Sequence, residues 1–173
     1  MTQQQPLFID ERAFAFASLV LTKGNDVAVR PFAGRDISID LLAEVLKDGK
    51  STARFFGAQV IGYLDLPSLA RVDERVHSHL GRDPFEAGLP LCAFVIGVRI
   101  PEGIFRWVIE PIVDGGRARL QAHVLTQREA QASWQALDDG AVVRIVEQVN
   151  AYYDTLNGRT APSVNARVST LED

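Results

Sequence analysis

The stretch from Asp36 to Gly62 reads DISIDLLAEVLKDGKSTARFFGAQVIG and carries the strongest fold signal in the chain. Polar and apolar residues alternate from Asp36 to Asp40, and residues 41–46 continue as a largely apolar run, a pattern typical of a β-strand. The dipeptide Asp48-Gly49 follows, and both residue types accept the positive φ that a tight hairpin turn requires. The pattern therefore predicts a strand, a turn and a second strand in direct succession.

The second strand, Phe55 to Tyr63, is apolar on both faces except at Gln59. A strand with two apolar faces is covered on both sides, so this pattern predicts the centre of a sheet. Asp40 places a carboxylate where the preceding strand enters the same sheet. A carboxylate beside a buried amide calls for a functional explanation, and we take Asp40 and Gln59 as candidate site residues.

Helix and strand signals on either side of this hairpin complete one domain. Asp10 is expected as the N-cap of a helix that ends at Thr22, because Lys23-Gly24 is a stop signal. We predict a single mixed α/β domain over residues 9–156, with a largely antiparallel sheet flanked by helices, and a flexible tail over residues 157–173. The other expected elements are a short strand at 27–29, a helix at Pro67–Leu80, strands at Leu91–Ile100, Ile104–Ile109 and Ala118–Leu125, and helices at Arg128–Leu137 and Asp139–Leu156, for which Thr126 and Asp138 are the expected caps.

The composition is that of a soluble globular protein, with 173 residues, 47% of them apolar and 23% charged. The net charge of −4 is spread evenly, so neither half has the basic footprint of sequence-independent nucleic-acid binding. No signal-peptide pattern and no membrane-length apolar run is found, which predicts a cytoplasmic protein without a membrane partner. The single cysteine, Cys92, lies in an apolar run and is expected to be a buried small hydrophobic residue.

Polar residues lie on successive expected elements in an order that can be compared with known protein families. Glu11 lies on the first helix, Asp40 opens a strand, and Gln59-Val60 lies on the next strand. Later in the chain, Trp107 lies in the second of two apolar strands. This order resembles the restriction-endonuclease-like superfamily, written PD-(D/E)XK, and within it a bacterial family of uncharacterised domains. The resemblance covers residues 9–156.

The resemblance implies a restriction-endonuclease-like mixed sheet with a metal-dependent nuclease site. In such a site carboxylates bind Mg²⁺ and a lysine holds or activates the attacking water. By this resemblance Asp40 and Glu11 are the metal ligands, and Asp40, Gln59 and Glu11 are the catalytic candidates. Ile61 occupies the position of the family's lysine. We therefore expect a catalytically impaired relative that acts as a binding or assembly subunit, in the bacterial defence or mobile-element setting that the family suggests.

Two other functions remain open. The first is an active Mg²⁺-dependent DNA or RNA endonuclease that uses Asp40 and Glu11 with a lysine or water from elsewhere. The second is a dimeric interaction module that uses the apolar face of the last helix. The candidate partners are accordingly nucleic acid, another protein, or a second copy of the chain. The residues of that helix face are Val142, Val146, Val149 and Tyr153.

Each site candidate also has a purely structural interpretation. Glu11 can serve only to complement the dipole of the first helix. Asp40 can hydrogen-bond the neighbouring loop, and Gln59 can satisfy backbone groups inside the sheet. These interpretations predict no metal binding at any of the three residues.

The histidines and aromatic residues favour structural roles. His77 and His79 are two residues apart on an expected helix and so point in nearly opposite directions, which disfavours a shared zinc site with His123. Phe105 and Trp107 share one face of an expected strand and are expected in the core rather than stacked on a base.

Overall fold

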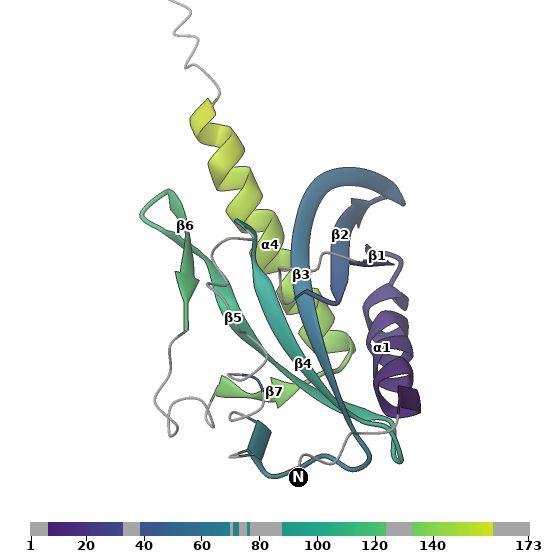
Figure 1. Ribbon diagram of the computed structural model, residues 1–173. Helices are drawn as coiled ribbons and strands as arrows, with labels where there is room; N and C mark the ends of the chain where they lie inside the picture. The colour runs from purple at the N-terminus through teal and green to yellow at the C-terminus, as the bar shows by residue number, and fades with distance from the viewer. Residues whose placement is uncertain are drawn as a thin grey trace, which may run out of the picture.

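The computed structural model describes residues 7–32, 39–69, 71–72, 76, 88–123 and 133–160. Within these ranges the chain forms one domain with two long helices and a seven-stranded sheet (Figure 1). The expected mixed α/β class is confirmed. The helices are α1 (Leu7–Thr22) and α4 (Asp139–Thr160), and the strands are β1 (Val27–Pro31), β2 (Leu41–Lys47), β3 (Lys50–Tyr63), β4 (Leu91–Gly97), β5 (Glu102–Asp114), β6 (Arg117–Ala122) and β7 (Gln135–Ala136).

The strands lie in the spatial order β1-β2-β3-β4-β5-β6, and the short β7 pairs with β5. Only β3 and β4 run parallel, and all the other pairs are antiparallel. A parallel pair needs a crossover connection, and residues 64–90 supply it. Among the described residues of this crossover, Val72 and Val76 are helical and fully buried. The central position predicted for β3 is confirmed.

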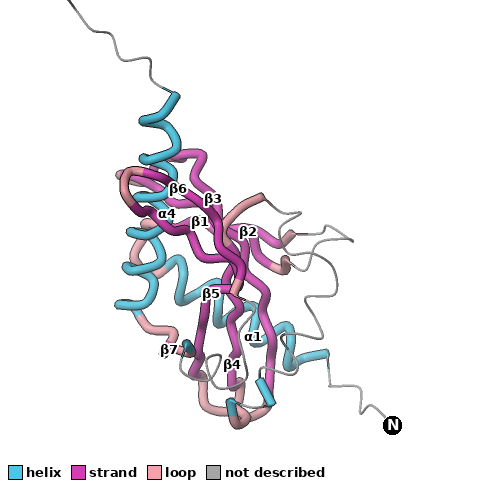
Figure 2. Tube along the Cα trace, turned by 90° about the vertical axis from the view of Figure 1, so that its left-hand side faces the viewer, coloured by secondary structure: helices cyan, strands magenta, loops and turns pink. Residues whose placement is uncertain are grey.

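The two helices cover the same face of the sheet, and α4 lies along one side of the strands (Figure 2). Small and aliphatic side chains of both helices pack there against alternate residues of the strands. The opposite face has its own apolar cluster, built by Ile61 of β3, by residues of β4 and β5, and by the two crossover valines. The sheet is therefore buried on both faces, as the apolar pattern of β3 predicts.

The contact between α1 and β3 is unusually close. A Cβ atom added at Gly62 of β3 would lie 2.8 Å from the carbonyl oxygen of Ile9 and 3.0 Å from the Cβ of Ala13. Only glycine permits this approach, because any larger residue would push the helix away. The first turns of α1, including Asp10 and Glu11, are thereby fixed beside the C-terminal half of β3.

The β2–β3 hairpin turns where the sequence predicts it. Asp48 and Gly49 have φ values of 52° and 70°. Ala53 also has a positive φ, 55°, beside a register shift in the hairpin, and here the ribbon curls over (Figure 1). The Glu44 carboxylate accepts hydrogen bonds from the Ser51 hydroxyl and the Ala53 N–H, and these contacts, the Ser51 bond first, lower its pKa.

Several predicted boundaries are wrong. Helix α1 begins at Leu7, so Asp10 lies inside its first turn and is not the N-cap. Strand β2 begins at Leu41, after Asp40, and residues 33–38 lie outside the described residues. Strand β3 begins at Lys50 rather than Phe55, because the curl keeps the first residues of the hairpin paired.

Differences also occur in the second half of the chain. Strand β4 ends at Gly97, β5 continues to Asp114, and β6 ends at Ala122. The helix expected at Arg128–Leu137 is wrong at residues 135–136, which pair with β5 instead, and residues 124–132 lie outside the described residues. Helix α4 continues to Thr160, four residues beyond its predicted end at Leu156. The predicted cap is confirmed, because Asp138 Oδ1 accepts a hydrogen bond of 2.7 Å from the Ala141 N–H.

Candidate functional site

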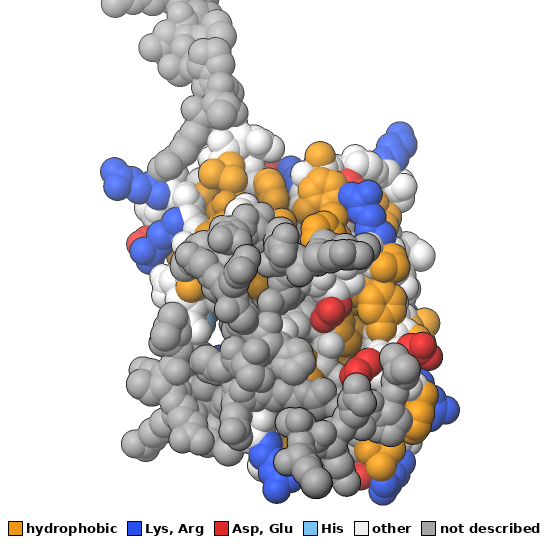
Figure 3. Space-filling view, viewed as in Figure 1, with side chains coloured by type: hydrophobic (Ala, Val, Ile, Leu, Met, Phe, Trp, Pro, Cys, Tyr) orange, Lys and Arg blue, Asp and Glu red, His pale blue; other side chains and the backbone are white. Residues whose placement is uncertain are grey.

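Glu11 and Asp40, distant in sequence, line the same cavity. The cavity has a volume of about 350 Å³ and opens between the first turns of α1 and the centre of the sheet. Asp10, Phe14 and Val60 complete its lining. Acidic and hydrophobic side chains lie next to each other on this side of the molecule, where α1 runs (Figure 3). The structure thus brings together the two residues expected as metal ligands, and it adds Asp10.

Backbone hydrogen bonds fix Asp40 at the start of β2. Its N–H donates to the carbonyl of Ala58, and its own carbonyl accepts from the N–H of Phe32, each at 2.9 Å. Its side-chain Oδ2 accepts a hydrogen bond of 2.7 Å from the N–H of Val60. The Asp40 carboxylate therefore continues the ladder between β2 and β3, and one of its oxygen atoms already has a structural role.

Gln59 lies on the other face of the sheet. Successive residues of a strand point to opposite faces, and the neighbours of Gln59 at positions 58 and 60 pack on the side of α1 and α4. The Gln59 side chain is 3% exposed, and its Oε1 has no hydrogen-bond partner among the described residues. Ile61 points the same way and is 2% exposed within the opposite apolar cluster. The structure therefore does not bring Gln59 together with Asp40 and Glu11.

The donor types at the cavity suit a hard cation such as Mg²⁺, which prefers carboxylate oxygens. Across the described ranges, however, no three His, Cys, Asp or Glu side chains come close enough together to bind one metal ion. Asp40 Oδ2 is also occupied by the Val60 N–H. The described residues therefore do not form a complete metal centre.

Sequence reasoning missed a polar network between β5, β6 and α4. His123 Nε2 lies 2.5 Å from Glu110 Oε2, and Gln148 Nε2 donates to Glu110 Oε1 at 3.2 Å. Trp107 Nε1 donates to Gln148 Oε1 at 2.8 Å. These four side chains connect the sheet to the middle of α4. His77 and His79, considered with His123 for a zinc site, lie outside the described residues.

A β-bulge explains why the residue pattern of the sequence does not predict this network. Leu91 pairs with Ile109 but Cys92 pairs with Trp107, so Val108 is an extra residue in β5. The extra residue reverses the alternation, and Glu110 points toward α4 as Trp107 does.

Burial, with the nearby Glu110 carboxylate, raises the pKa of the Cys92 thiol. Cys92 is thus a buried core residue, as expected.

The α4 face considered for dimerisation is already used inside the molecule. Val142 and Val149 are buried against the sheet, and the Tyr153 hydroxyl donates to the carbonyl of Phe55 at 3.1 Å. In contrast, Val143 on the same helix is 53% exposed. Any surface that α4 offers to a partner therefore includes Val143, next to the buried stripe.

Comparison of the chain with known protein families, with curated proteins and with solved structures finds no match. Within the described ranges, neither helix combines the length and hydrophobicity that a membrane crossing requires. The class defined by fold and site is therefore a mixed α/β domain with a carboxylate-lined cavity beside its first helix.

Proposed function

We propose that this chain is a catalytically impaired, restriction-endonuclease-like domain that acts as a binding or assembly subunit. The order of its elements supports the family resemblance. Glu11 lies on α1, Asp40 directly precedes β2, Gln59 lies on β3, and Trp107 lies on β5 beside β4. Glu11 and Asp40 line one cavity, as the proposal requires, and no lysine or arginine lines it among the described residues.

One observation carries the proposal: adjacent residues of β3 point to opposite sides of the sheet. Val60 lines the cavity of Asp40 and Glu11, whereas Ile61 is buried in the opposite apolar cluster. A lysine at position 61 would therefore extend away from the carboxylates. The chain has three lysines, Lys23, Lys47 and Lys50, and none of them lines the cavity. Among the described residues, the cavity thus has no cationic side chain that could activate water.

The proposal is tested by incubating the chain with plasmid and with single-stranded DNA and RNA, in the presence of Mg²⁺ or Mn²⁺ and with EDTA as control. We expect no metal-dependent cleavage, and no difference between wild type and Asp40→Asn. The Asn side chain keeps an oxygen that can accept the hydrogen bond from Val60, so the variant should fold. A thermal-shift titration with both metals on the same two proteins measures metal binding independently of turnover.

The second candidate function is an active Mg²⁺-dependent endonuclease. The observation that favours it is that Asp10, Glu11 and Asp40 line one cavity. Cleavage that is abolished both by EDTA and by Asp40→Asn would overturn our proposal in favour of this candidate. A metal-induced thermal shift without cleavage, lost in Asp40→Asn, would instead show a carboxylate pair that binds metal and does no chemistry.

A further inference from the structure

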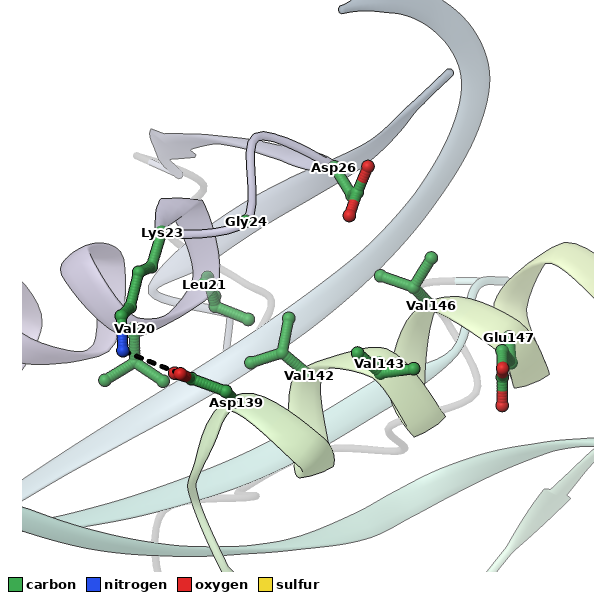
Figure 4. Close-up of a pocket in the computed structure, with 10 residues that line it drawn as sticks. All are labelled: Val20, Leu21, Lys23, Gly24, Asp26, Asp139, Val142, Val143, Val146 and Glu147. Atoms are coloured by element: carbon green, nitrogen blue, oxygen red, sulfur yellow. Dashed lines mark hydrogen bonds and ion pairs between the residues drawn. The ribbon is translucent and has the colours of Figure 1, made fainter. Parts of the chain in front are cut away.

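A second cavity opens between the C-terminal end of α1 and the N-terminal half of α4 (Figure 4). Its volume is about 290 Å³, and its walls are aliphatic. Val20 and Leu21 come from α1, and Val142, Val143 and Val146 come from α4. We call this cavity the valine cleft. It is lined by described residues only, and it is separate from the carboxylate cavity at the other end of α1.

The valine cleft exposes apolar surface that folding leaves uncovered. Val143, which lines the cleft, is 53% exposed. Helix α4 already packs Val142, Ile145 and Val149 against the sheet, so Val143 adds little to the core. Contiguous exposed apolar surface with a polar rim is typical of interaction sites in soluble proteins.

The rim of the valine cleft is acidic. Four charged residues line it: one lysine, Lys23, and three acids, which gives a net charge of −2. Lys23 Nζ pairs with Asp139 Oδ2 at 2.6 Å (Figure 4). The other two acids, Asp26 and Glu147, have no ion pair within the described part of the chain. Asp139 also offsets the positive N-terminal end of the α4 dipole, so the rim stays attractive to cations.

We infer that the valine cleft docks a short amphipathic segment of a partner protein, with one or two aliphatic side chains in the cleft and lysine or arginine opposite Asp26 and Glu147. The cavity volume is at the lower end of the roughly 300–1,000 Å³ of ligand pockets, which suits anchoring side chains better than a large cofactor. This inference rests on the proposed function and names the chemistry of the partner that a binding subunit would recognise.

A second copy of the chain is a poorer occupant. A symmetric dimer through this surface would place two acidic rims against each other, and the whole chain carries a net charge of −4. Like charges across an interface are unfavourable, whereas a basic segment is attracted to the same rim. Charge complementarity therefore selects a different, basic partner.

The test is a selection from a randomised peptide library, with the whole 173-residue chain as the target. The key variant is Val143→Asp, which adds a charge to the cleft at a side chain that packs little. The matched control is Val113→Asp, at a valine of β5 that is 42% exposed and does not line the cleft. Both variants are checked for folding by their circular dichroism and thermal unfolding.

We expect the enriched peptides to share an aliphatic anchor flanked by lysine or arginine. Their binding should be unchanged by Val113→Asp and weakened at least about tenfold by Val143→Asp, as for removal of a central anchor contact. The double variant Asp26→Asn, Glu147→Gln should weaken binding several-fold and reduce its salt dependence.

Four outcomes would overturn the inference: no enrichment, enrichment of acidic or purely apolar peptides, equal binding to both valine variants, or a concentration-dependent dimer that Val143→Asp dissociates. The last outcome would assign the cleft to a second copy of the chain. None of these measurements involves metal or nucleic acid, so their failure is distinct from failure of the proposed function, which would appear as EDTA-sensitive cleavage.

Discussion

The two faces of the sheet differ most at β3, where Val60 and Ile61 are neighbours in sequence. Val60 faces α1 and shares a cavity with Asp40 and Glu11. Ile61 faces a closed apolar cluster that no helix of the α1–α4 layer contacts. In the described part of the chain, the two cavities lined by both acidic and hydrophobic side chains lie on the side of α1 and α4. The difference shows that residues with the spacing of a sequence motif can form one site only if their side chains lie on the same face of the sheet.

The second face is not uniformly apolar. Gln59 pairs with Ala93 of β4, and Ala93 pairs with Arg106 of β5, so a buried amide and a buried guanidinium flank a small residue in one row. Arg106 is 2% exposed, and its guanidinium carbon lies 5.1 Å from the centre of the Trp134 ring. Polar groups on this face are enclosed, whereas those on the first face reach solvent.

The comparison is tested most strongly by Ile61→Lys, with Val60→Lys as its control. An ammonium in this cluster loses its hydration, and none of the described residues of the cluster is acidic, so we expect Ile61→Lys to lower the free energy of unfolding by on the order of 3–4 kcal/mol. Val60→Lys places the same group beside Asp40 and Glu11, and we expect a loss below about 1.5 kcal/mol. Urea unfolding followed by tryptophan fluorescence measures both.

This pair of variants also tests the lysine position itself. We expect Ile61→Lys to create no metal-dependent cleavage, because its side chain points away from the carboxylates. Equal stability of the two variants, or nuclease activity gained by Ile61→Lys alone, would show that position 61 reaches the carboxylate cavity and that the assignment of the two faces is wrong.

A smaller effect is expected where α1 packs on β3. Gly62→Ala adds a methyl group that would lie 2.8 Å from the backbone oxygen of Ile9, which cannot move without the helix. Gly57→Ala, on the opposite face, meets side-chain atoms of Ile39 and Leu91, the nearest of them at 2.9 and 3.0 Å. We expect Gly62→Ala to cost about 1–3 kcal/mol.

For Gly57→Ala we expect a loss of less than about 1 kcal/mol, because alanine restricts the unfolded chain and flexible side chains can shift. Urea unfolding again gives both values. A larger loss for Gly57→Ala than for Gly62→Ala would mean that α1 is the adaptable layer, and the fixed placement of Glu11 beside β3 would no longer hold.

Local signals in the sequence predicted the parts of the fold that depend on one segment alone. The turn at Asp48-Gly49 follows from residue types that accept positive φ, and the cap at Asp138 follows from a side chain that bonds the helix N-terminus. The central position of β3 follows from its two apolar faces. The pairing of Glu11 with Asp40 at one cavity was predicted by the resemblance and by nothing local.

The other features of the fold and the site depend on backbone irregularities that the residue pattern does not predict. The extra residue Val108 turns Glu110 toward α4, and strict alternation would have put it on the other face. The positive φ of Ala53 extends β3 by a curl that an alanine does not suggest. Residues 135–136 pair with β5 although the sequence around them predicts a helix, because strand contacts override weak local propensity.

The smallest expected effect concerns Lys23→Ala at the valine cleft. The side chains of Lys23 and Asp139 are both more than half exposed, so removing their ion pair should change the free energy of unfolding by less than about 1 kcal/mol.

The Lys23→Ala substitution also leaves Asp139 without its ion-pair partner Lys23 and makes the rim more acidic. If a basic segment docks there, its affinity should rise roughly two- to threefold at low salt, and the gain should disappear at high salt. Fluorescence anisotropy with a selected peptide measures this change. A loss of affinity would mean that Lys23 itself contacts the segment, and the charge assigned to the partner would have to be reversed.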